Sequence, residues 1–532
     1  MHRGRLASTM KRALAFLTLS TALLLAGYAA ASTVLAEKFR LPVTEHTLKN
    51  GMRFLIVERR ESPTFSAYIR FKVGSVNEAP GQTGLAHLLE HMMFKGTSEF
   101  GSTDPVRERP LLAQIDALHA ALQVERRKKR LAGATPDPHR VAAIEKELAG
   151  LEEQAKRFII RNELWEIYRR NGGTNLNAST SRDGTQYFIS LPKNRLELWA
   201  LLESDRLRDP VFREFYTERD VVQEERRQRV DTNPRGQLME AAVSAAFTAV
   251  PYRHPILGWP GDLENLSRPQ AQAYFKTYYA PNNALAVLVG DLDPAEVIRL
   301  AERYFGGLPP QPIPPAPILE EPPQTGERRV RVEFPAEPQI LMLYQAPPLG
   351  HPDTYPLAVL ATLLGDGRSS RLHKRLVEEK RLATSISAGP WLLQYAGQFT
   401  IQATPRAPHT PDEVEAAIED EIAALKAELA SPREMLKVRN QTEVETVENL
   451  ASNAGLASRL GGAWALTDDW RSLFSDQERL AAVTAEDVRG VAQRYLILGR
   501  RTVASLVRGS GTVAGGAAAR RPLGTQQPWD SN

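Results

Sequence analysis

The chain has 532 residues, too many for one compact domain and enough for several. Hydrophobic residues make up 42% of it and charged residues 24%, a balance typical of a folded protein and not of a disordered one. The formal net charge is +4, but residues 1–31 hold four basic residues and no acid, so the rest of the chain is formally neutral. A basic surface for binding nucleic acid is therefore not supported.

Residues 1–36 are typical of an export signal. A positive segment ends at Arg12, an apolar stretch covers residues 13–26, and small residues suited to a signal peptidase follow at 29–32. An uncleaved membrane anchor is the alternative, because residues 13–36 carry no charge and are about long enough to span a bilayer. We expect a periplasmic protein, or one anchored in the membrane and facing the periplasm. The chain has no cysteine, which excludes disulfides and a lipid-modified cysteine anchor.

The first half of the remaining chain predicts mixed strands and helices. Alternating apolar residues and turn residues indicate the strands, and apolar residues three or four apart indicate the helices. The predicted elements are a strand, turn and strand over 45–57, a strand over 65–73, a helix over 81–93, a hairpin over 175–192, a strand over 284–289 and a helix over 294–304.

Residues 104–160 predict a separate helical hairpin. Apolar residues recur at helical steps on both sides of a break at 134–138, as in the seam of a coiled coil. The basic run at 126–130 lies near the tip and is interpreted as a solvated helix end. Because such a seam needs only its own partner helix, we expect the hairpin to pack outside any active site and to serve docking.

A proline-rich linker over residues 308–325 divides the chain. The part after it repeats the order of strand, strand and helix, which indicates an internal duplication. A final stretch rich in Gly and Ala predicts a flexible tail. The predicted organisation is an export signal or anchor over 1–36, a first domain over 37–307 that contains the hairpin, the linker over 308–325, a second domain over 326–508 and the tail over 509–532.

The run from His87 to His91 has the spacing of a metal site. Two histidines four residues apart project from one face of a helix, as tetrahedral zinc requires, and Glu90 lies on the same side, within reach of a water molecule. A pattern this short also arises by chance on an amphipathic helix whose polar residues face solvent. The strong apolarity of this helix, and the chain's total of ten histidines, favour the metal site.

A third ligand is available in the acidic segment 218–225. Glu218 and Glu225 are two helical turns apart and therefore lie on one face, and Glu224 is the neighbour most easily confused with Glu225. For a helix of this composition, a charged face turned to solvent is the alternative interpretation.

Several motifs together resemble the pitrilysin/insulinase family of zinc metallopeptidases. The stretch 84–97 resembles the signature of that family, and the segments 177–183 and 218–225 match its other landmarks in the right order. The linker and the segment 365–372 match its second half. The resemblance covers about residues 40–505 except the helical hairpin, and the size is similar to the branch that contains mitochondrial processing peptidase and its bacterial relatives.

The resemblance implies a zinc-dependent endopeptidase that hydrolyses peptides or unfolded segments. It implies that His87, His91 and Glu225 bind one Zn²⁺, that Glu90 is the general base, and that Glu218 orients a ligand histidine. The alternative is a catalytically silent structural or chaperone subunit of the same fold. Silent subunits typically lose parts of the motif, whereas this sequence retains all five residues.

The resemblance also implies a fold, a substrate-binding strand and a partner. The fold is α+β, with two similar α/β-sandwich domains that form one half-shell. Asn177 and Ala178 are implied to lie on an exposed edge strand to which the peptide substrate adds. An Arg and a Tyr expected in the second half fall on Val377 and Thr384, so we expect a homologous subunit without zinc, or a second copy, to complete the site.

Overall fold

Two β-sheets organise the chain in the computed structural model, which describes residues 41–128, 135–316 and 318–509. The predicted export signal over 1–36 lies outside the described residues, as does the predicted tail beyond residue 509. The described residues from Thr44 onward form one unit. Within the described ranges, no helix combines the length and apolarity needed to cross a bilayer.

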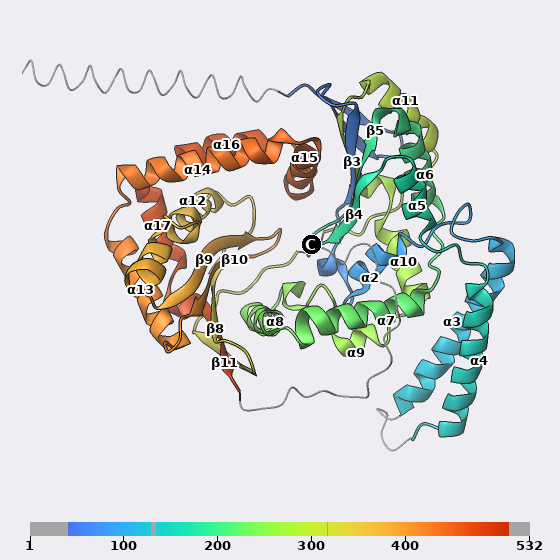
Figure 1. Ribbon diagram of the computed structural model, residues 1–532, viewed down its shortest axis with the longest axis horizontal. Helices are drawn as coiled ribbons and strands as arrows, with labels where there is room; N and C mark the ends of the chain where they lie inside the picture. The colour runs from blue at the N-terminus through green and yellow to red at the C-terminus, as the bar shows by residue number, and fades with distance from the viewer. Residues whose placement is uncertain (1–40, 129–134, 317, 510–532) are drawn as a thin grey trace, which may run out of the picture. The chain divides into compact units, whose positions relative to one another are not determined.

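The first sheet has six strands in the order β1-β2-β6-β3-β5-β4 (Figure 1). Strand β2 runs parallel to β6, and β6, β3, β5 and β4 are joined antiparallel, which leaves β4 at an edge. The strands are β1 (Val43–Thr47), β2 (Arg53–Glu58), β3 (Thr64–Phe71), β4 (Thr174–Thr180), β5 (Thr185–Pro192) and β6 (Ala284–Gly290).

The second sheet repeats the topology of the first. Its order is β7-β11-β8-β10-β9, again with one parallel pair, β7 with β11, and antiparallel pairs elsewhere. The five strands therefore correspond one by one to β2, β6, β3, β5 and β4, which confirms the predicted internal duplication. Its strands are β7 (Arg328–Phe334), β8 (Gln339–Ala346), β9 (Ala383–Leu392), β10 (Gly397–Pro405) and β11 (Arg501–Arg508).

The helices of each half pack partly on the other half. Helix α15 from the second half covers one face of the first sheet at β3 and β6, while α6 and α11 lie on the opposite face (Figure 1). Reciprocally, α8 from the first half packs on β7, β8 and β11. The main helices are α2 (Leu85–Met92), α5 (Glu163–Arg170), α6 (Leu196–Arg208), α7 (Phe215–Arg226), α8 (Pro234–Ala246), α9 (Pro260–Leu263), α10 (Arg268–Tyr278), α11 (Pro294–Tyr304), α12 (Thr354–Gly365), α13 (Pro411–Ala427), α14 (Pro432–Ala451), α15 (Asn453–Thr467), α16 (Ser472–Ala482) and α17 (Ala485–Tyr495).

Local sequence signals set several helix boundaries. Helix α11 begins where predicted, because the Asp293 side chain accepts a hydrogen bond from the Ala295 backbone N–H at 3.0 Å and Pro294 occupies the first helical position. Two five- to seven-residue π-helical segments, η4 (Arg227–Asp231) and η7 (His373–Glu379), were not predicted. Segment η4 follows α7 directly, whereas residues 366–372 separate η7 from α12, and no distinct periodicity marks either segment in the sequence.

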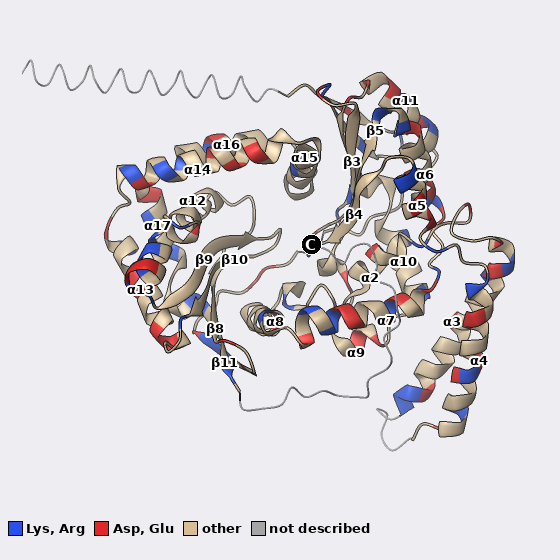
Figure 2. Cartoon of the chain, in the orientation of Figure 1, with Lys and Arg blue, Asp and Glu red and all other residues tan. Residues whose placement is uncertain are grey.

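The predicted helical hairpin is formed by α3 (Pro105–Arg127) and α4 (Pro138–Lys156), both rich in charged residues (Figure 2). The expectation that its seam needs only its own partner helix is wrong. The buried seam residues Ile115 and Leu148 belong to the same hydrophobic core as the first sheet. Tyr216 of α7 also stacks on His119, with ring centroids 3.4 Å apart, and donates a hydrogen bond to Asp116 at 3.0 Å. The hairpin is therefore anchored on α7.

Candidate metal centre

The two histidines of the His87–His91 run converge with Glu225 on one point. The histidines lie on α2, and Glu225 lies near the end of α7, which packs against α2. The Nε2 atoms of His87 and His91 are 3.7 and 3.6 Å from the same carboxylate oxygen, Oε2 of Glu225. The three side chains are 10%, 9% and 18% exposed, so the cluster is largely shielded from solvent.

The position of α2 is fixed by burial and by its first turn. Every residue of the helix is buried, and Gly84 precedes it with φ of 90°, a left-handed conformation that favours glycine. The Glu78 carboxylate accepts hydrogen bonds from the backbone N–H groups of Gly84 and Ala86 at 3.0 and 2.8 Å. These bonds satisfy donors that have no partner within the helix.

The geometry of the cluster and the neutral form of His87 both fit zinc. Tetrahedral zinc with bonds of about 2.0–2.1 Å to nitrogen and oxygen holds its ligand atoms about 3.4 Å apart, close to the two separations from Glu225, and all three ligand atoms lie within 4.8 Å of one another. Burial, with a contribution from neighbouring His91 and Arg229, holds the pKa of His87 well below its usual value. The neutral imidazole is the form that binds metal. The other ring nitrogen of His87, Nδ1, is buried and has no hydrogen-bond partner among the described residues.

Glu218 lies beside His91, outside the convergent set. Its Oε2 is 3.4 Å from Nδ1 of His91, the ring nitrogen that faces away from Glu225, and its Oε1 accepts a hydrogen bond from Nζ of Lys95. Burial opposes the charge on His91, but the hydrogen bond and negative charge of Glu218 outweigh it and raise the pKa of His91. Burial likewise acts against the Glu218 charge, but His91 and Lys95 together lower its pKa.

Glu90 also faces the centre without joining the three converging groups. It is 9% exposed, and its Oε2 accepts a hydrogen bond from the Thr180 hydroxyl at the end of β4. Burial raises the pKa of Glu90, while His91 and the Thr180 hydroxyl act in the opposite direction. A carboxylate in this position has the surroundings of a proton acceptor.

Glu224 points away from the histidines. Its side chain is 48% exposed and accepts hydrogen bonds from Arg227 and Gln228 on the next turn. Glu225, seven residues after Glu218, lies on the same face of the helix as Glu218, and its neighbour Glu224 does not.

Asn177 and Ala178 lie on edge strand β4 and line a cavity of about 460 Å³ that also contains His87, Glu90 and Glu225. The Asn177 Oδ1 accepts a hydrogen bond from the Ala178 backbone N–H at 2.8 Å. The side chain of Asn177 therefore binds the backbone of the next residue in the strand. Asn177 and Ala178 therefore lie both at the edge of the first sheet and in the wall of the cavity.

Sequence reasoning missed three residues around the cluster. Thr180 and Lys95 lie within the segments 177–183 and 84–97, but their positions in the sequence do not predict that they contact Glu90 and Glu218. Arg229 forms an ion pair with Glu225, with Nη1 2.9 Å from Oε1, and its side chain is 65% exposed. Its position four residues after Glu225 is a signal for such an ion pair.

Val377 and Thr384, where the resemblance places an Arg and a Tyr, lie in the second half. Val377 packs against the core of the second sheet, and the Thr384 hydroxyl donates to the Thr404 carbonyl at 3.2 Å. Neither is among the described residues that line the cavity. Helix α12, which has the place of α2 in the second sheet, carries no His or Glu.

Family comparisons match both halves of the chain. A family described as "Insulinase (Peptidase family M16)" matches residues 53–109 and 160–258, and "Peptidase M16 inactive domain" matches residues 265–442. The interruption from 110 to 159 falls in the helical hairpin, so the hairpin lies outside the matched pattern except for residues 105–109 at the start of α3.

Individual proteins are similar over most of the chain. The zinc protease PqqE of Helicobacter pylori is 28% identical over 465 residues, which cover 84% of this chain and 89% of that protein. A probable mitochondrial-processing peptidase subunit beta of Arabidopsis thaliana is 24% identical, covering 85% of this chain and 75% of its own. The crystal structure of a protease from Helicobacter pylori superposes with a TM-score of 0.73 at 26% identity and covers 88% of this chain and 100% of that one.

Proposed function

Because the chain belongs to the insulinase family of M16 peptidases, we propose that it is a zinc-dependent endopeptidase acting on peptides or unfolded segments. The observation that carries the proposal is the convergence of His87, His91 and Glu225, with Glu90 beside them. The description "inactive domain" applies to residues 265–442, whereas all candidate site residues lie in the part matched as insulinase.

In the proposed mechanism His87, His91 and Glu225 hold one Zn²⁺. When bound there, zinc would supply Lewis-acid chemistry toward a water molecule and the scissile carbonyl. Glu90 accepts the proton of that water and later delivers it to the leaving amine. The Thr180 hydroxyl donates to Oε2 of Glu90 and thereby helps to hold the carboxylate toward the cavity. Glu218 holds the imidazole of His91 in the tautomer that presents Nε2 to the metal.

Strand β4 is proposed to bind the substrate backbone. An edge strand presents free N–H and C=O groups, and a peptide added alongside Asn177 and Ala178 passes the cavity that contains Glu90. Main-chain pairing of this kind gives affinity without requiring a particular sequence. Phe94 and Met239 give the same cavity an apolar part for side chains.

A partner and an extracytoplasmic location belong to the same proposal. The cavity-lining residues that the structure describes all lie between His87 and Leu257, so the second half adds none to the site. A homologous subunit without zinc, or a second copy of the chain, is proposed to complete it. One similar protein is itself named as a subunit. The composition of residues 1–31 supports export, followed by release into the periplasm or anchoring at its membrane.

The test is Glu90→Gln in the full chain, assayed on an unstructured peptide both alone and with the homologous partner added, together with a metal analysis. We expect hydrolysis to fall by at least about 100-fold, the lower range for a positioned acid–base group, while one zinc per chain remains. Glu224→Gln is the matched control, because its exposed carboxylate faces away from the histidines. Near-normal turnover by Glu90→Gln would refute the mechanism.

The same assay addresses the silent-subunit alternative. A wild-type chain that binds no zinc, and that cleaves nothing even with a homologous partner added, would favour a structural or chaperone subunit. Activity that appears only after the partner is added supports the proposed heterodimer.

A further inference from the structure

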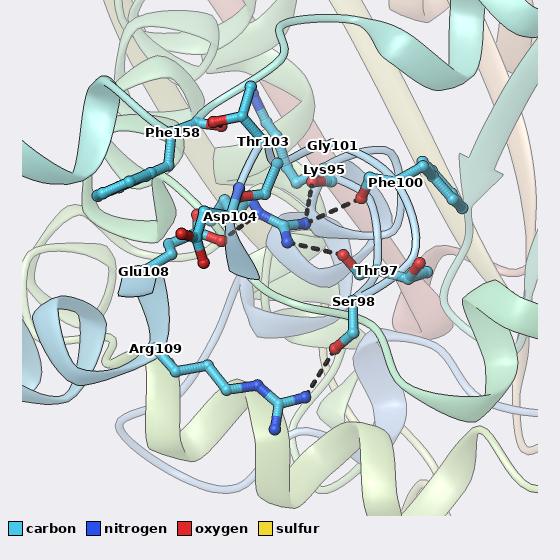
Figure 3. Close-up of polar contacts among 12 residues, drawn as sticks. Lys95, Thr97, Ser98, Phe100, Gly101, Thr103, Asp104, Glu108, Arg109 and Phe158 are labelled. Carbon is cyan, nitrogen blue, oxygen red and sulfur yellow. Dashed lines mark hydrogen bonds and ion pairs between the residues drawn. The ribbon is translucent and has the colours of Figure 1, made fainter. Parts of the chain in front are cut away.

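Arg213 is a wholly buried arginine in the loop between α6 and α7, and it binds the segment that follows the His87–His91 helix. Its guanidinium donates to the backbone carbonyls of Lys95 and Thr97 at 3.1 and 2.6 Å and to that of Phe100 at 3.3 Å. Figure 3 shows these carbonyl groups converging on one guanidinium group beside Glu108. One side chain thus holds three successive parts of the loop.

The counter-charge of Arg213 comes from the first turn of the helical hairpin. Both carboxylate oxygens of Glu108 on α3 accept from Nε of Arg213 at 2.9 Å, and the two side chains are 0% and 1% exposed. A buried arginine without a carboxylate would carry a large desolvation cost, so Glu108 is required for Arg213 to occupy this position.

The sequence of the loop is adapted to the guanidinium group. Gly96 and Gly101 have φ of 88° and 90°, and a Cβ atom at either would lie 3.0 or 3.1 Å from Nη1 of Arg213. Side chains here would therefore both strain the backbone and crowd the arginine. Two independent features, the buried ion pair and the two glycines, fix the same loop conformation.

The loop leads back to the metal centre through Lys95. The backbone carbonyl of Lys95 binds Arg213, and its Nζ binds Glu218, whose other carboxylate oxygen faces Nδ1 of His91. The contacts thus run without interruption from Glu108 to a proposed metal ligand.

We propose that Glu108 and Arg213 are positioning residues for the metal centre. They fix the loop after α2 so that Lys95 keeps Glu218 against His91. The base of the hairpin thereby supports metal binding, although the hairpin contributes no ligand. This inference rests on the proposed function only in taking His91 as a zinc ligand.

The test is the zinc affinity of the full-length chain carrying Glu108→Gln, measured by competition with a chelator. Removing direct partners of metal ligands weakens binding by about 10- to 100-fold, and because Glu108 acts through Arg213, Lys95 and Glu218, we expect a loss of about 10-fold. The absorption spectrum of the cobalt-substituted variant should also change, because the orientation of His91 is altered. A merely structural role would lower the thermal midpoint of the metal-free protein without moving either readout.

Two controls separate positioning from general destabilisation. Arg109→Gln alters the next residue of α3, whose 60%-exposed side chain contacts the same loop at Ser98. Glu415→Gln removes a buried carboxylate that pairs with Arg501 in the second sheet. Both should keep the wild-type zinc affinity, even where Glu415→Gln lowers the thermal midpoint.

The zinc affinity and the cobalt spectrum of Glu108→Gln decide whether Glu108 positions the metal centre. Unchanged zinc affinity and an unchanged cobalt spectrum in folded Glu108→Gln would overturn it. If that variant does not fold, Glu108→Asp keeps the charge but withdraws the carboxylate by one methylene, and wild-type affinity there would overturn the inference equally. A wild-type chain that fails to bind zinc stoichiometrically would instead refute the proposed function.

Discussion

Replacing Glu218 by Gln tests how the support around His91 contributes to metal binding. The amide keeps the shape of the side chain but removes the negative charge that lies 3.4 Å from Nδ1 of His91. It also leaves the Lys95 ammonium, 14% exposed, with Glu214 at 3.8 Å as its remaining carboxylate contact among the described residues. Both changes disfavour a divalent cation at the neighbouring site.

We expect zinc affinity to fall by about 10- to 100-fold, the range observed when partners of ligand histidines are removed. At about 1.4 kcal/mol for each factor of ten, this is a loss of about 1.4–2.8 kcal/mol in binding free energy. Breaking a buried ion pair also costs stability, by about 3 kcal/mol at the lower end of the usual range. Chelator competition measures the first quantity, and thermal unfolding of the metal-free protein measures the second.

The double variant Lys95→Met with Glu218→Gln separates the two causes. It removes the stranded ammonium, so stability should recover while His91 still lacks its carboxylate. We expect zinc affinity to stay low in the double variant. Wild-type affinity in Glu218→Gln would refute the role given to Glu218, and full recovery in the double variant would assign the loss to the unpaired Lys95 charge.

Two further predictions concern other carboxylates. Glu225→Gln should lose stoichiometric zinc whereas Glu224→Gln should keep it, because Glu225 alone of the two converges with the histidines, and metal analysis of both purified variants checks this. In the second half, the ion pair with Arg371 lowers the pKa of Glu434 from 4.5 to about 2, so its contribution to stability is present above pH 4.5 and is lost as the pH falls toward 2. Because the side chain is partly exposed, Glu434→Gln should cost about 1 kcal/mol at neutral pH, with a difference from wild type that shrinks in acid unfolding curves; an unchanged difference at low pH would contradict this.

The sequence predicted the strands, the duplicated order and the converging residues because those features depend on local spacing. The four-residue step from His87 to His91 and the seven-residue step from Glu218 to Glu225 are properties of a single helix each. The contact of Glu108 with Arg213 joins residues 105 apart in the chain, and no periodicity predicts it. For the same reason, periodicity identified the seam of the hairpin but missed its packing on Tyr216, which belongs to another helix.

The second half adds no residue to the described lining of the cavity, but it contacts the turn at the end of β4, and the duplicated topology explains this contact. The turn after β4 carries Asp183, whose carboxylate accepts hydrogen bonds from the Gln394 backbone N–H at 3.1 Å and from the Tyr252 hydroxyl. The Tyr395 backbone N–H in turn donates to Tyr252 at 3.2 Å. Residues 394 and 395 form the turn between β9 and β10, the counterpart of the turn that holds Asp183. The two equivalent turns thus bind each other, and the second half, which carries none of the candidate metal ligands, holds the end of the strand on which Thr180 meets Glu90.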